Sequence, residues 1–434
     1  MASANADVQD RDTVRRWVCA AVALAFLLRL AIIFATHAYT FPPSAPVHDP
    51  LKQNFFFGFE IGRVARSVAS GHGFGSPFHG WTGPTAWYPP VYPYLLAAVF
   101  KVFGIYSHAS GMVILSLNSA FAALTCIPLF GLGERVVGPR VALWPVWLWA
   151  VLPIFFPFAT KWAWETSLST LLLMLALWLA LRLAEASDWR PWFAAGVLWG
   201  AIALTNTSLL SLMPFALAWA WWCSPHPNRT RHALLAVAVF ILALMPWMAR
   251  NRAVMGKWIF VRDNFWAEMR FGNADQSRGI WLGWMNPTNN DIELARYREL
   301  GELRYIAEKK AAVLEFLRRR PGFFLDLCVR RAFFFWCNLP TDWSENLSPH
   351  EVLRDQWWMI VFSALAWIGM LLMLLRGPRT LALLLAPSLI VYPVLYYIAS
   401  ADARYRHPIE PLMLLLAIYA VNTARQHRLA PVAA

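Results

Sequence analysis

The sequence has little charge for its length and very few lysines. Only 15% of its 434 residues are charged, whereas soluble globular domains average about 25%. Only six of the 38 cationic side chains are lysines, and the five cysteines show neither a CxxC pair nor a metal-ligand spacing. These shortages exclude a disulfide-stapled secreted domain and an ordinary cytosolic enzyme. The cysteines indicate no function.

Apolar and aromatic residues take the place of the missing charge. The chain is 59% apolar and contains 25 Trp, 29 Phe and 12 Tyr, which excludes a disordered chain. This composition is typical of a protein that crosses the bilayer several times, with aromatic belts at both surfaces. The net charge of +13 comes from short cationic clusters between apolar runs. It therefore indicates membrane topology and contact with membrane lipids, and we expect no nucleic-acid partner.

Long apolar runs recur along the chain. The first, at residues 17–36, follows a basic start and is long enough to cross about 30 Å of hydrocarbon. It lacks a small-residue cleavage site, so we interpret it as an uncleaved first helix. The further runs are 109–133, 141–158, 167–183, 191–206, 208–223, 233–249, 356–375, 380–398 and 408–422. The sequence predicts an all-α polytopic membrane protein with about ten transmembrane helices.

Arginine pairs predict the orientation of these helices. Every second connection carries one: Arg135/Arg140, Arg182/Arg190, Arg229/Arg231, Arg376/Arg379 and Arg425/Arg428. By the positive-inside rule these connections and both termini are cytoplasmic, which leaves two long loops, 37–108 and 250–355, on the outer face. We predict an N-terminal transmembrane module (1–249) containing the first outer loop, a helical outer region (250–355) and C-terminal transmembrane helices (356–434).

Acidic residues are nearly missing from the middles of the apolar runs. Those that flank the runs gather at their outer ends, namely Asp49, Glu60, Glu165, Asp402 and Glu410. A carrier needs charged groups or broken helices near the bilayer midplane. This distribution therefore favours chemistry at the outer face over conduction through the membrane.

The first outer loop contains a short charged helix. Glu60, Arg63 and Ser67 share one helical face by their spacing. A carboxylate held by Arg63 would stay ionised and oriented, as a base or metal ligand must be; a salt bridge on a surface helix is the alternative. The GHGFG stretch at 71–75 lacks the strand and the Lys-Ser/Thr of a phosphate loop, so we interpret it as a flexible turn.

Other polar residues of the outer loops suggest structural roles. His48, His72 and His79 have no fixed metal-ligand spacing. In the second loop, residues 292–320 are predicted to form a charged helix, and residues 323–336 an interfacial helix with Arg330 and Arg331 toward lipid headgroups. Arg29 is near the outer end of its apolar run, and we expect its side chain to reach the interface.

Several motifs follow one another in a recognisable order. The stretch from Glu60 is EIGRVARSVASGHGF, and residues 88–104 are YPPVYPYLLAAVFKVFG. KWAWET (161–166), PWMARNR (246–252) with DNF (263–265), and ARYRHPIEP (403–411) come later. This ordered set spans most of the chain and resembles the GT-C superfamily of membrane glycosyltransferases. It is similar in particular to the bacterial branch with the protein O-mannosyltransferases and the aminoarabinose transferase that modifies lipid A.

The resemblance implies a donor sugar on a polyprenyl phosphate and a lipid, glycan or protein acceptor. Both would meet at the periplasmic face of a bacterial inner membrane. We expect Glu60 to be the base of an inverting single displacement and Glu165 to orient the acceptor. The expected substrate-binding residues are Arg63, Tyr88, Lys161, Arg250, Arg404 and Arg406. For the last four of these residues, anchoring to lipid headgroups is the alternative.

One position departs from the superfamily pattern. The best-known members carry an acid shortly before the position that Glu60 matches, and here Asn54 stands in its place. Glu60 takes the role of base, or Asp49 reaches in from upstream, or the acceptor needs little activation. The sequence requires no metal; if Glu60 and Glu165 hold one, their oxygen ligands suit Mg or Mn.

Two rival functions stay open. One is a non-enzymatic lipid or solute transporter or flippase. Pro145, Pro153 and Pro157 in the third apolar run are consistent with the broken helices that such proteins use. The other is a ligase or polymerase of surface polysaccharide, for which different loop motifs are expected.

Overall fold

The structure, a computed structural model, describes residues 2–41, 57–337 and 349–429. Within these ranges every regular element is helical, and strand-like pairing is limited to two isolated bridges, Gly75 with Pro84 and Ile280 with Ala401. The predicted all-α class is therefore confirmed.

Six helical segments of the described chain are long and apolar enough to cross a membrane. They belong to α1 (Ala2–Ala35), α4 and α5 (His108–Leu124, Cys126–Val137), α8 (Thr166–Glu185), α11 (Arg229–Met255), α16 (Pro349–Arg376), and α17 and α18 (Arg379–Ile390, Val394–Ile398). The remaining helices of the bundle are α6 (Leu143–Val151), α7 (Pro157–Thr160), α9 (Arg190–Ala203), α10 (Met213–Cys223) and α19 (Glu410–Leu429). The chain is an integral membrane protein; the count of about ten spans stays a prediction.

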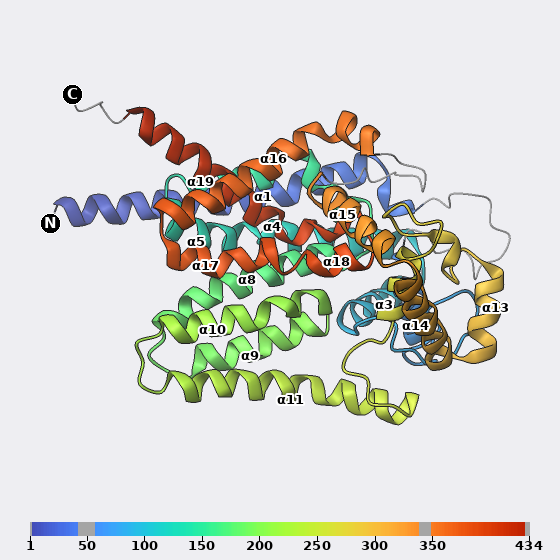
Figure 1. Cartoon of the computed structure of the whole chain (residues 1–434). Coiled ribbons are helices and arrows are strands. Elements are labelled where there is room, and N and C mark those ends of the chain that lie inside the picture. Colours follow the sequence, from blue (N-terminus) through green and yellow to red (C-terminus); the bar gives the residue numbers. More distant parts are fainter. Residues whose placement is uncertain (1, 42–56, 338–348, 430–434) are drawn as a thin grey trace.

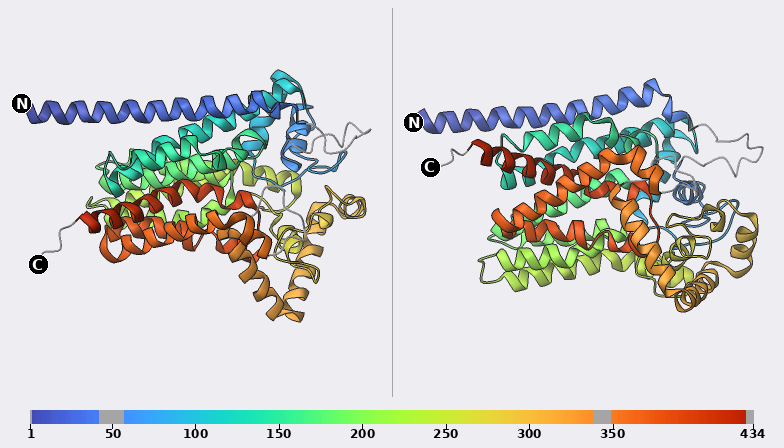
Figure 2. Two further views of the ribbon diagram at one scale, coloured as in Figure 1. Left: turned by 90° about the horizontal axis from the view of Figure 1, so that it is seen from above. Right: turned by 45° about the horizontal axis from the view of Figure 1, so that its top comes forward.

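The long helices lie side by side in one bundle (Figure 1). The first and last described helices, α1 and α19, both point their free ends out of the same end of the bundle, while α2 (Glu60–Ala69), α3 (Val91–Phe103), α13 (Asp291–Leu300) and α14 (Glu302–Arg319) lie at the opposite end. Figure 2 shows the same separation from two further directions. The arrangement agrees with two outer loops and two termini on opposite sides. The cytoplasmic assignment and the predicted boundaries at 249 and 355 stay predictions.

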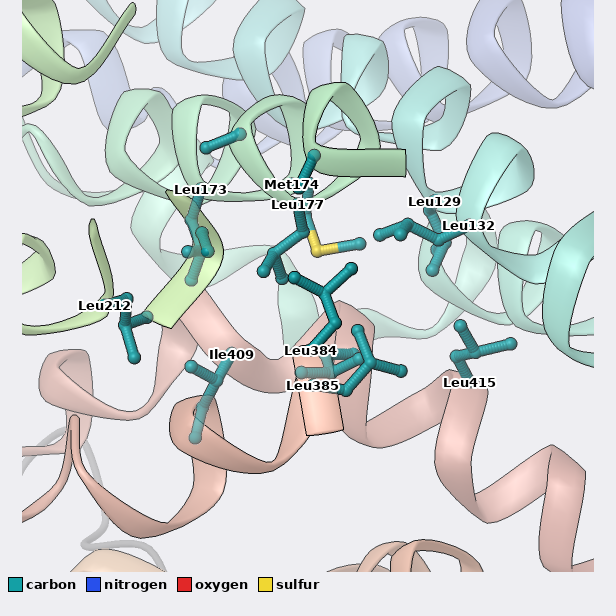
Figure 3. Close-up of a cluster of buried hydrophobic side chains, with 14 of the residues drawn as sticks. Leu129, Leu132, Leu173, Met174, Leu177, Leu212, Leu384, Leu385, Ile409 and Leu415 are labelled. Atoms are coloured by element: carbon teal, nitrogen blue, oxygen red, sulfur yellow. The ribbon is translucent and has the colours of Figure 1, made fainter. Parts of the chain in front are cut away.

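The helix α8 lies at the centre of the apolar core. Its side chains Leu173, Met174 and Leu177 are buried against α5, α17 and α19 (Figure 3). The helix is apolar on all sides, as expected of a helix with neighbours all around it. The first residue after its N-cap, Thr166, lies at the outer end of the bundle next to the predicted acid Glu165.

The outer region is built from four helices, α12 (Phe265–Gly272), α13, α14 and α15 (Pro321–Cys337). The single helix predicted at 292–320 is divided, because Gly301 adopts a φ of +69° and ends α13. Aromatic side chains form its core: Phe78 packs edge-to-face on Trp87 and on Tyr297, with ring centroids 4.9 and 4.7 Å apart. The first outer loop and the second loop therefore share one core.

A buried carboxylate ties the two outer loops together. Glu302, the first residue of α14, accepts hydrogen bonds from the hydroxyl of Thr85, from the backbone N–H of Ala86 at 2.6 Å and from the hydroxyl of Tyr297 at 2.7 Å. A buried acceptor with three donors holds its partners firmly, since breaking the contact would leave them unpaired. We call this contact the Glu302 latch. It fixes the segment that leads to Tyr88.

The expectation that Arg29 reaches the interface is wrong. Its side chain is fully buried and donates to the carbonyls of Trp149 at 3.1 Å and Ala150 at 3.3 Å. Both carbonyls lie in the last turn of the short helix α6, where no backbone N–H follows to bind them. Arg29 thus satisfies a helix end inside the bundle.

The expectation for Arg331 is wrong for the same reason. Its buried guanidinium donates to the carbonyls of Gly272, the last residue of α12, and of Ile398, the last residue of α18. It also donates to Asn273 Oδ1 at 3.1 Å. Arg330 is partly exposed and pairs with Asp326 at 2.8 Å. The helix α15 is therefore fastened to the ends of two other helices.

Candidate functional site

The predicted base Glu60 is buried at the start of α2. Gly58 and Phe59 precede it with φ values of +82° and +50°, so the chain turns sharply into the helix. Asn286 Nδ2 and Thr288 Oγ1 donate to Glu60 Oε1 at 3.1 and 2.9 Å. Because both donors come from the outer region, the carboxylate is oriented by a segment far away in sequence.

Arg63 joins the same network through Thr288. Its Nη1 donates to Thr288 Oγ1 at 3.1 Å, and the Thr288 hydroxyl in turn donates to Glu60. Burial lowers the pKa of the Arg63 guanidinium, and the nearby negative charge of Glu60 opposes that shift. Both side chains are buried, so the alternative of a surface salt bridge does not describe this pair.

A backbone contact brings the segment of Glu60 against the segment of Glu165. A Cβ atom added at Gly58 would lie 2.4 Å from the carbonyl oxygen of Ala163. Only glycine fits such an approach, and its positive φ also favours glycine. The contact sets the spacing between the two stretches that carry the predicted acids.

Beside this contact lies a cavity with about 760 Å³ of space free of protein atoms, part of it open to solvent. Three predicted site residues line it: Tyr88, Glu165 and Arg404. Arg262 and Glu268, which were not predicted, line it as well. Helices from the bundle and the outer region therefore meet around one group of charged side chains.

The pKa of Tyr88 reflects the charged groups around this cavity. Burial raises the pKa of its hydroxyl well above the usual range, and the charge of Glu60 raises it further. Glu268 and Glu165 act in the same direction, while Arg404 acts against them. Three carboxylates and one guanidinium thus lie close enough to act on a single side chain.

Glu268 has a strongly shifted pKa. Burial in α12 is the main cause, and Glu60 adds to it, whereas Arg262 and Arg404 oppose it. The result is a pKa of about 7 instead of the usual 4.5. A carboxyl group of this kind is a hydrogen-bond donor for part of the time at neutral pH.

Arg404 lies above an aromatic platform. Its guanidinium carbon is 4.5 Å from the ring centroid of Trp164, which stacks on Trp162 with centroids 4.6 Å apart. Arg404 Nε is buried without a hydrogen-bond partner in the described chain, and its ion pair with Asp402 is long, at 3.9 Å. Cation–π contact holds the guanidinium and leaves this one donor without a partner.

Glu165 is the N-cap residue of α8, and one of its oxygens, Oε2, is buried without a partner among the residues that the structure describes. The backbone before it is held by Asn118, whose Nδ2 donates to the carbonyls of Trp162 at 3.0 Å and Trp164 at 3.4 Å. An unpaired buried carboxylate oxygen is costly. Such an atom next to a cavity is a natural partner for a ligand hydroxyl or a cation.

The other predicted substrate-binding residues lie outside the cavity lining. Lys161 is exposed, with its ammonium 5.7 Å from the ring centroid of Trp162. Arg250 donates to the carbonyls of Thr85 and Phe74. Arg406 is buried and pairs with Glu410 at 3.0 Å. Asp49, like Asn54 and His48, lies outside the described residues.

Sequence reasoning missed Glu268, Arg262, Asn286 and Thr288. All four lie in the second outer loop, the most polar stretch of the chain, where charged side chains are too common to single any out. The DNF segment just before Glu268 is marked in the sequence only by its place in the order of motifs. The long-range partners of Glu60 left no local pattern in the sequence.

Metal binding finds little support among the described side chains. In residues 2–41, 57–337 and 349–429, no group of three or more His, Cys, Asp or Glu side chains is arranged to hold a metal ion. We therefore derive no chemical step through a metal. The predicted Mg or Mn on Glu60 and Glu165 stays a prediction.

Comparison with known proteins gives one family match and several structural matches. Residues 88–249, less than half of the chain, match the family described as dolichyl-phosphate-mannose-protein mannosyltransferase. No curated protein matches the chain in sequence. The matched region begins at Tyr88 and includes Glu165, so it covers part of the cavity.

Archaeal oligosaccharyltransferases share the architecture. AglB from Archaeoglobus fulgidus, in complex with an inhibitory peptide and a dolichol-phosphate, matches with a TM-score of 0.54 and 13% identity, covering 95% of this chain and 51% of AglB. The oligosaccharyltransferase of the same organism in complex with Zn and sulfate matches with a TM-score of 0.54 and 13% identity, over 94% of this chain and 49% of that one. This chain spans about half the length of these enzymes.

ArnT from Cupriavidus metallidurans, bound to undecaprenyl phosphate, is also similar, with a TM-score of 0.38 and 14% identity over 94% of this chain and 78% of ArnT.

Fold and cavity together define a polytopic membrane protein with the GT-C architecture. Residues 88–249 match the mannosyltransferase family and the fold matches that of AglB, so the predicted resemblance to GT-C glycosyltransferases is confirmed.

Proposed function

We propose that the chain transfers a sugar from a polyprenyl-phosphate donor to an acceptor at the outer face of the membrane. The observation that carries this proposal is the cavity at the outer end of a GT-C bundle, where Glu165, Glu268, Arg262 and Arg404 gather beside Tyr88. Residues of both the bundle and the outer region line the cavity, which suits a site shared by a lipid-anchored donor and a second substrate.

The two arginines suit the donor. A phosphate leaving group needs its growing negative charge stabilised and needs no strong acid. Arg404 and Arg262 line the cavity, and a guanidinium can bind two phosphate oxygens at once. Arg404 Nε has no hydrogen-bond partner in the described chain, which supports Arg404 as the first contact of the phosphate.

The carboxylates suit the acceptor. Glu60 is the proposed base: its Oε1 accepts from Asn286 and Thr288, which leaves Oε2 to take the proton of the attacking hydroxyl or amine. Glu165 orients the acceptor through its unpaired oxygen. Glu268, with a pKa of about 7, donates a hydrogen bond to substrate when it is protonated. The attack comes from the face opposite the phosphate, so the anomeric centre is inverted.

The proposal also concerns the membrane, the acceptor and a possible cation. We propose a bacterial inner membrane with the cavity facing the periplasm, and a lipid, glycan or protein acceptor. AglB was solved with a dolichol-phosphate and a peptide, which is consistent with one lipid-linked and one separate substrate. If a divalent cation is needed, transfer will stop in EDTA and return with Mg or Mn.

The test is transfer from labelled polyprenyl-phosphate sugars by the purified full chain, followed by the release of free lipid phosphate. Glu60→Gln should lower the rate about a thousandfold, because the amide cannot take the proton, with unchanged thermal stability. The matched control is Glu299→Gln, since Glu299 is an exposed acid of the outer region.

The outcomes separate the hypotheses. Full transfer by Glu60→Gln would remove Glu60 from the role of base and leave Asp49 as the other predicted acid. No transfer by the unaltered chain from any donor would overturn the proposed function. Movement of labelled lipid across vesicles without release of lipid phosphate would favour the transporter.

A further inference from the structure

A second cavity lies next to the GHGFG turn that the sequence marked out. It has about 880 Å³ of space free of protein atoms and shares no lining residue with the first cavity. Its walls come from residues 72–76 and 83–84, from Trp81, from Tyr94 of α3, and from Arg250 and Val254 of α11. We call it the glycine-turn cavity.

The two cavities differ in charge. Glu165 and Glu268 line the first, whereas no Asp or Glu of the described residues lines the glycine-turn cavity. Its ionisable lining residues are His72, Tyr94 and Arg250. Behind its wall, the guanidinium of Arg66 lies 4.8 Å from the ring centroid of Trp81. A cavity lined this way attracts anions.

Backbone amides of the turn add hydrogen-bond donors. The carbonyl of Gly73 accepts from Ser67 Oγ at 2.9 Å, and the carbonyl of Phe74 accepts from the N–H of Thr85 at 3.3 Å and from Arg250. In a trans peptide the N–H points opposite to the carbonyl. The N–H groups of Phe74 and Gly75 therefore point away from these partners.

Neither of these two N–H groups donates to another backbone or side-chain group of the described chain. Backbone donors are normally paired, with protein, water or ligand. The hydroxyl of Ser76, which accepts from the N–H of Thr82 at 3.0 Å, keeps its own proton to donate. Adjacent amides and a hydroxyl next to a guanidinium form a typical concave anion site.

We propose that the glycine-turn cavity binds a phosphate-type anion, carried by a lipid headgroup or free in solution. A lipid headgroup has access, because Tyr94 of α3 and Val254, in the last turn of α11, are each 46% exposed. The proposal is independent of sugar transfer. The GHGFG turn would then bind phosphate although it lacks the Lys-Ser/Thr of a phosphate loop.

The test adds one carboxylate to the wall of the cavity. Val254→Glu puts negative charge at an exposed lining residue and should fold normally. Ile292→Glu is the matched control, because Ile292 is 81% exposed in the outer region and lines none of the cavities described here. Purified full chain in detergent is offered phosphatidylglycerol or phosphatidylcholine, and retained lipid is read by native mass spectrometry. A second arm titrates inorganic phosphate by calorimetry.

We expect selective binding of phosphatidylglycerol or of inorganic phosphate, weakened at least about tenfold by Val254→Glu and unchanged by Ile292→Glu. Binding in the lipid arm alone identifies a headgroup, and binding in both arms with mutual competition identifies one site for either source. Absence of binding in both arms, or equal binding by Val254→Glu, overturns the proposal. Should Val254→Glu fail to fold, His72→Glu at an exposed lining position replaces it.

Discussion

Arg404 and Arg406 stand two residues apart and have opposite surroundings. Arg404 lines the cavity above Trp164, with Nε unpaired. Arg406 is buried among protein groups and donates to Glu410 at 3.1 and 3.0 Å and to the carbonyl of Trp336 at 2.9 Å. Two short 3-10 turns, at 403–405 and 407–409, send the two side chains in different directions.

The difference teaches that one motif can contain both a ligand contact and a structural support. Every nitrogen of the Arg406 guanidinium already donates to a protein acceptor, so none is left for a substrate. The guanidinium of Arg404 lies over an aromatic ring, and its Nε has no hydrogen-bond partner among the described residues. Substitutions at the two positions should therefore separate stability from activity.

The largest effect is expected for Arg406→Met. Glu410 would stay buried without the guanidinium and keep only its contact with His407 Nδ1 at 2.7 Å among the described side chains, which costs up to about 3–5 kcal/mol of unfolding free energy. Thermal unfolding in detergent should show a marked drop in the midpoint, partly recovered in Arg406→Met with Glu410→Leu. An unchanged midpoint for the single variant would contradict the assignment of Arg406 as a structural support.

Arg404→Ala should leave the unfolding midpoint near that of the unaltered chain. It should weaken the apparent affinity for a polyprenyl-phosphate donor by roughly 10–100-fold, the effect of losing a charge-assisted hydrogen bond. Arg404→Lys should restore part of the affinity, since it keeps the charge and loses the planar fork. Normal affinity in Arg404→Ala would remove this residue from the phosphate site.

Glu268 should make both the stability and the transfer rate of the protein depend on pH. Its pKa rises from 4.5 to about 7 in the folded protein, so between these values the folded state holds a proton that the unfolded state has lost. Stability should fall as pH rises through this interval, and transfer should fall above about pH 7 as the donor proton is lost. Glu268→Gln should flatten both profiles, measured by thermal unfolding and by rate from pH 5 to 9. Profiles identical to those of the unaltered chain would show that Glu268 is not the titrating group.

The smallest effect is expected for Thr288→Val. The change removes the hydroxyl that links Arg63 to Glu60 and should lower kcat about five- to tenfold with little change in KM, the effect of one buried hydrogen bond. Thr36→Val is the control, because Thr36 bonds only to its own helix turn. A change confined to KM would indicate a role in binding.

The sequence predicted the all-α class and the gathering of acids at the outer face, because hydropathy and charge position follow directly from a bilayer. Glu165 could be found since it borders an apolar run. Asn286 and Thr288 could not, because they meet Glu60 across 226 and 228 residues. For Arg29 and Arg331, hydropathy does not reveal whether a guanidinium will reach lipid or the open end of a broken helix.

The Glu302 latch has a consequence for protein engineering. Tyr297 packs on Phe78 and Trp87, and Glu302 holds Thr85 and Ala86. A chimaera that receives the outer region of a relative must therefore take residues 78–88 with it. Recombination breakpoints therefore belong outside both outer loops, so that the two loops are inherited as a matched pair.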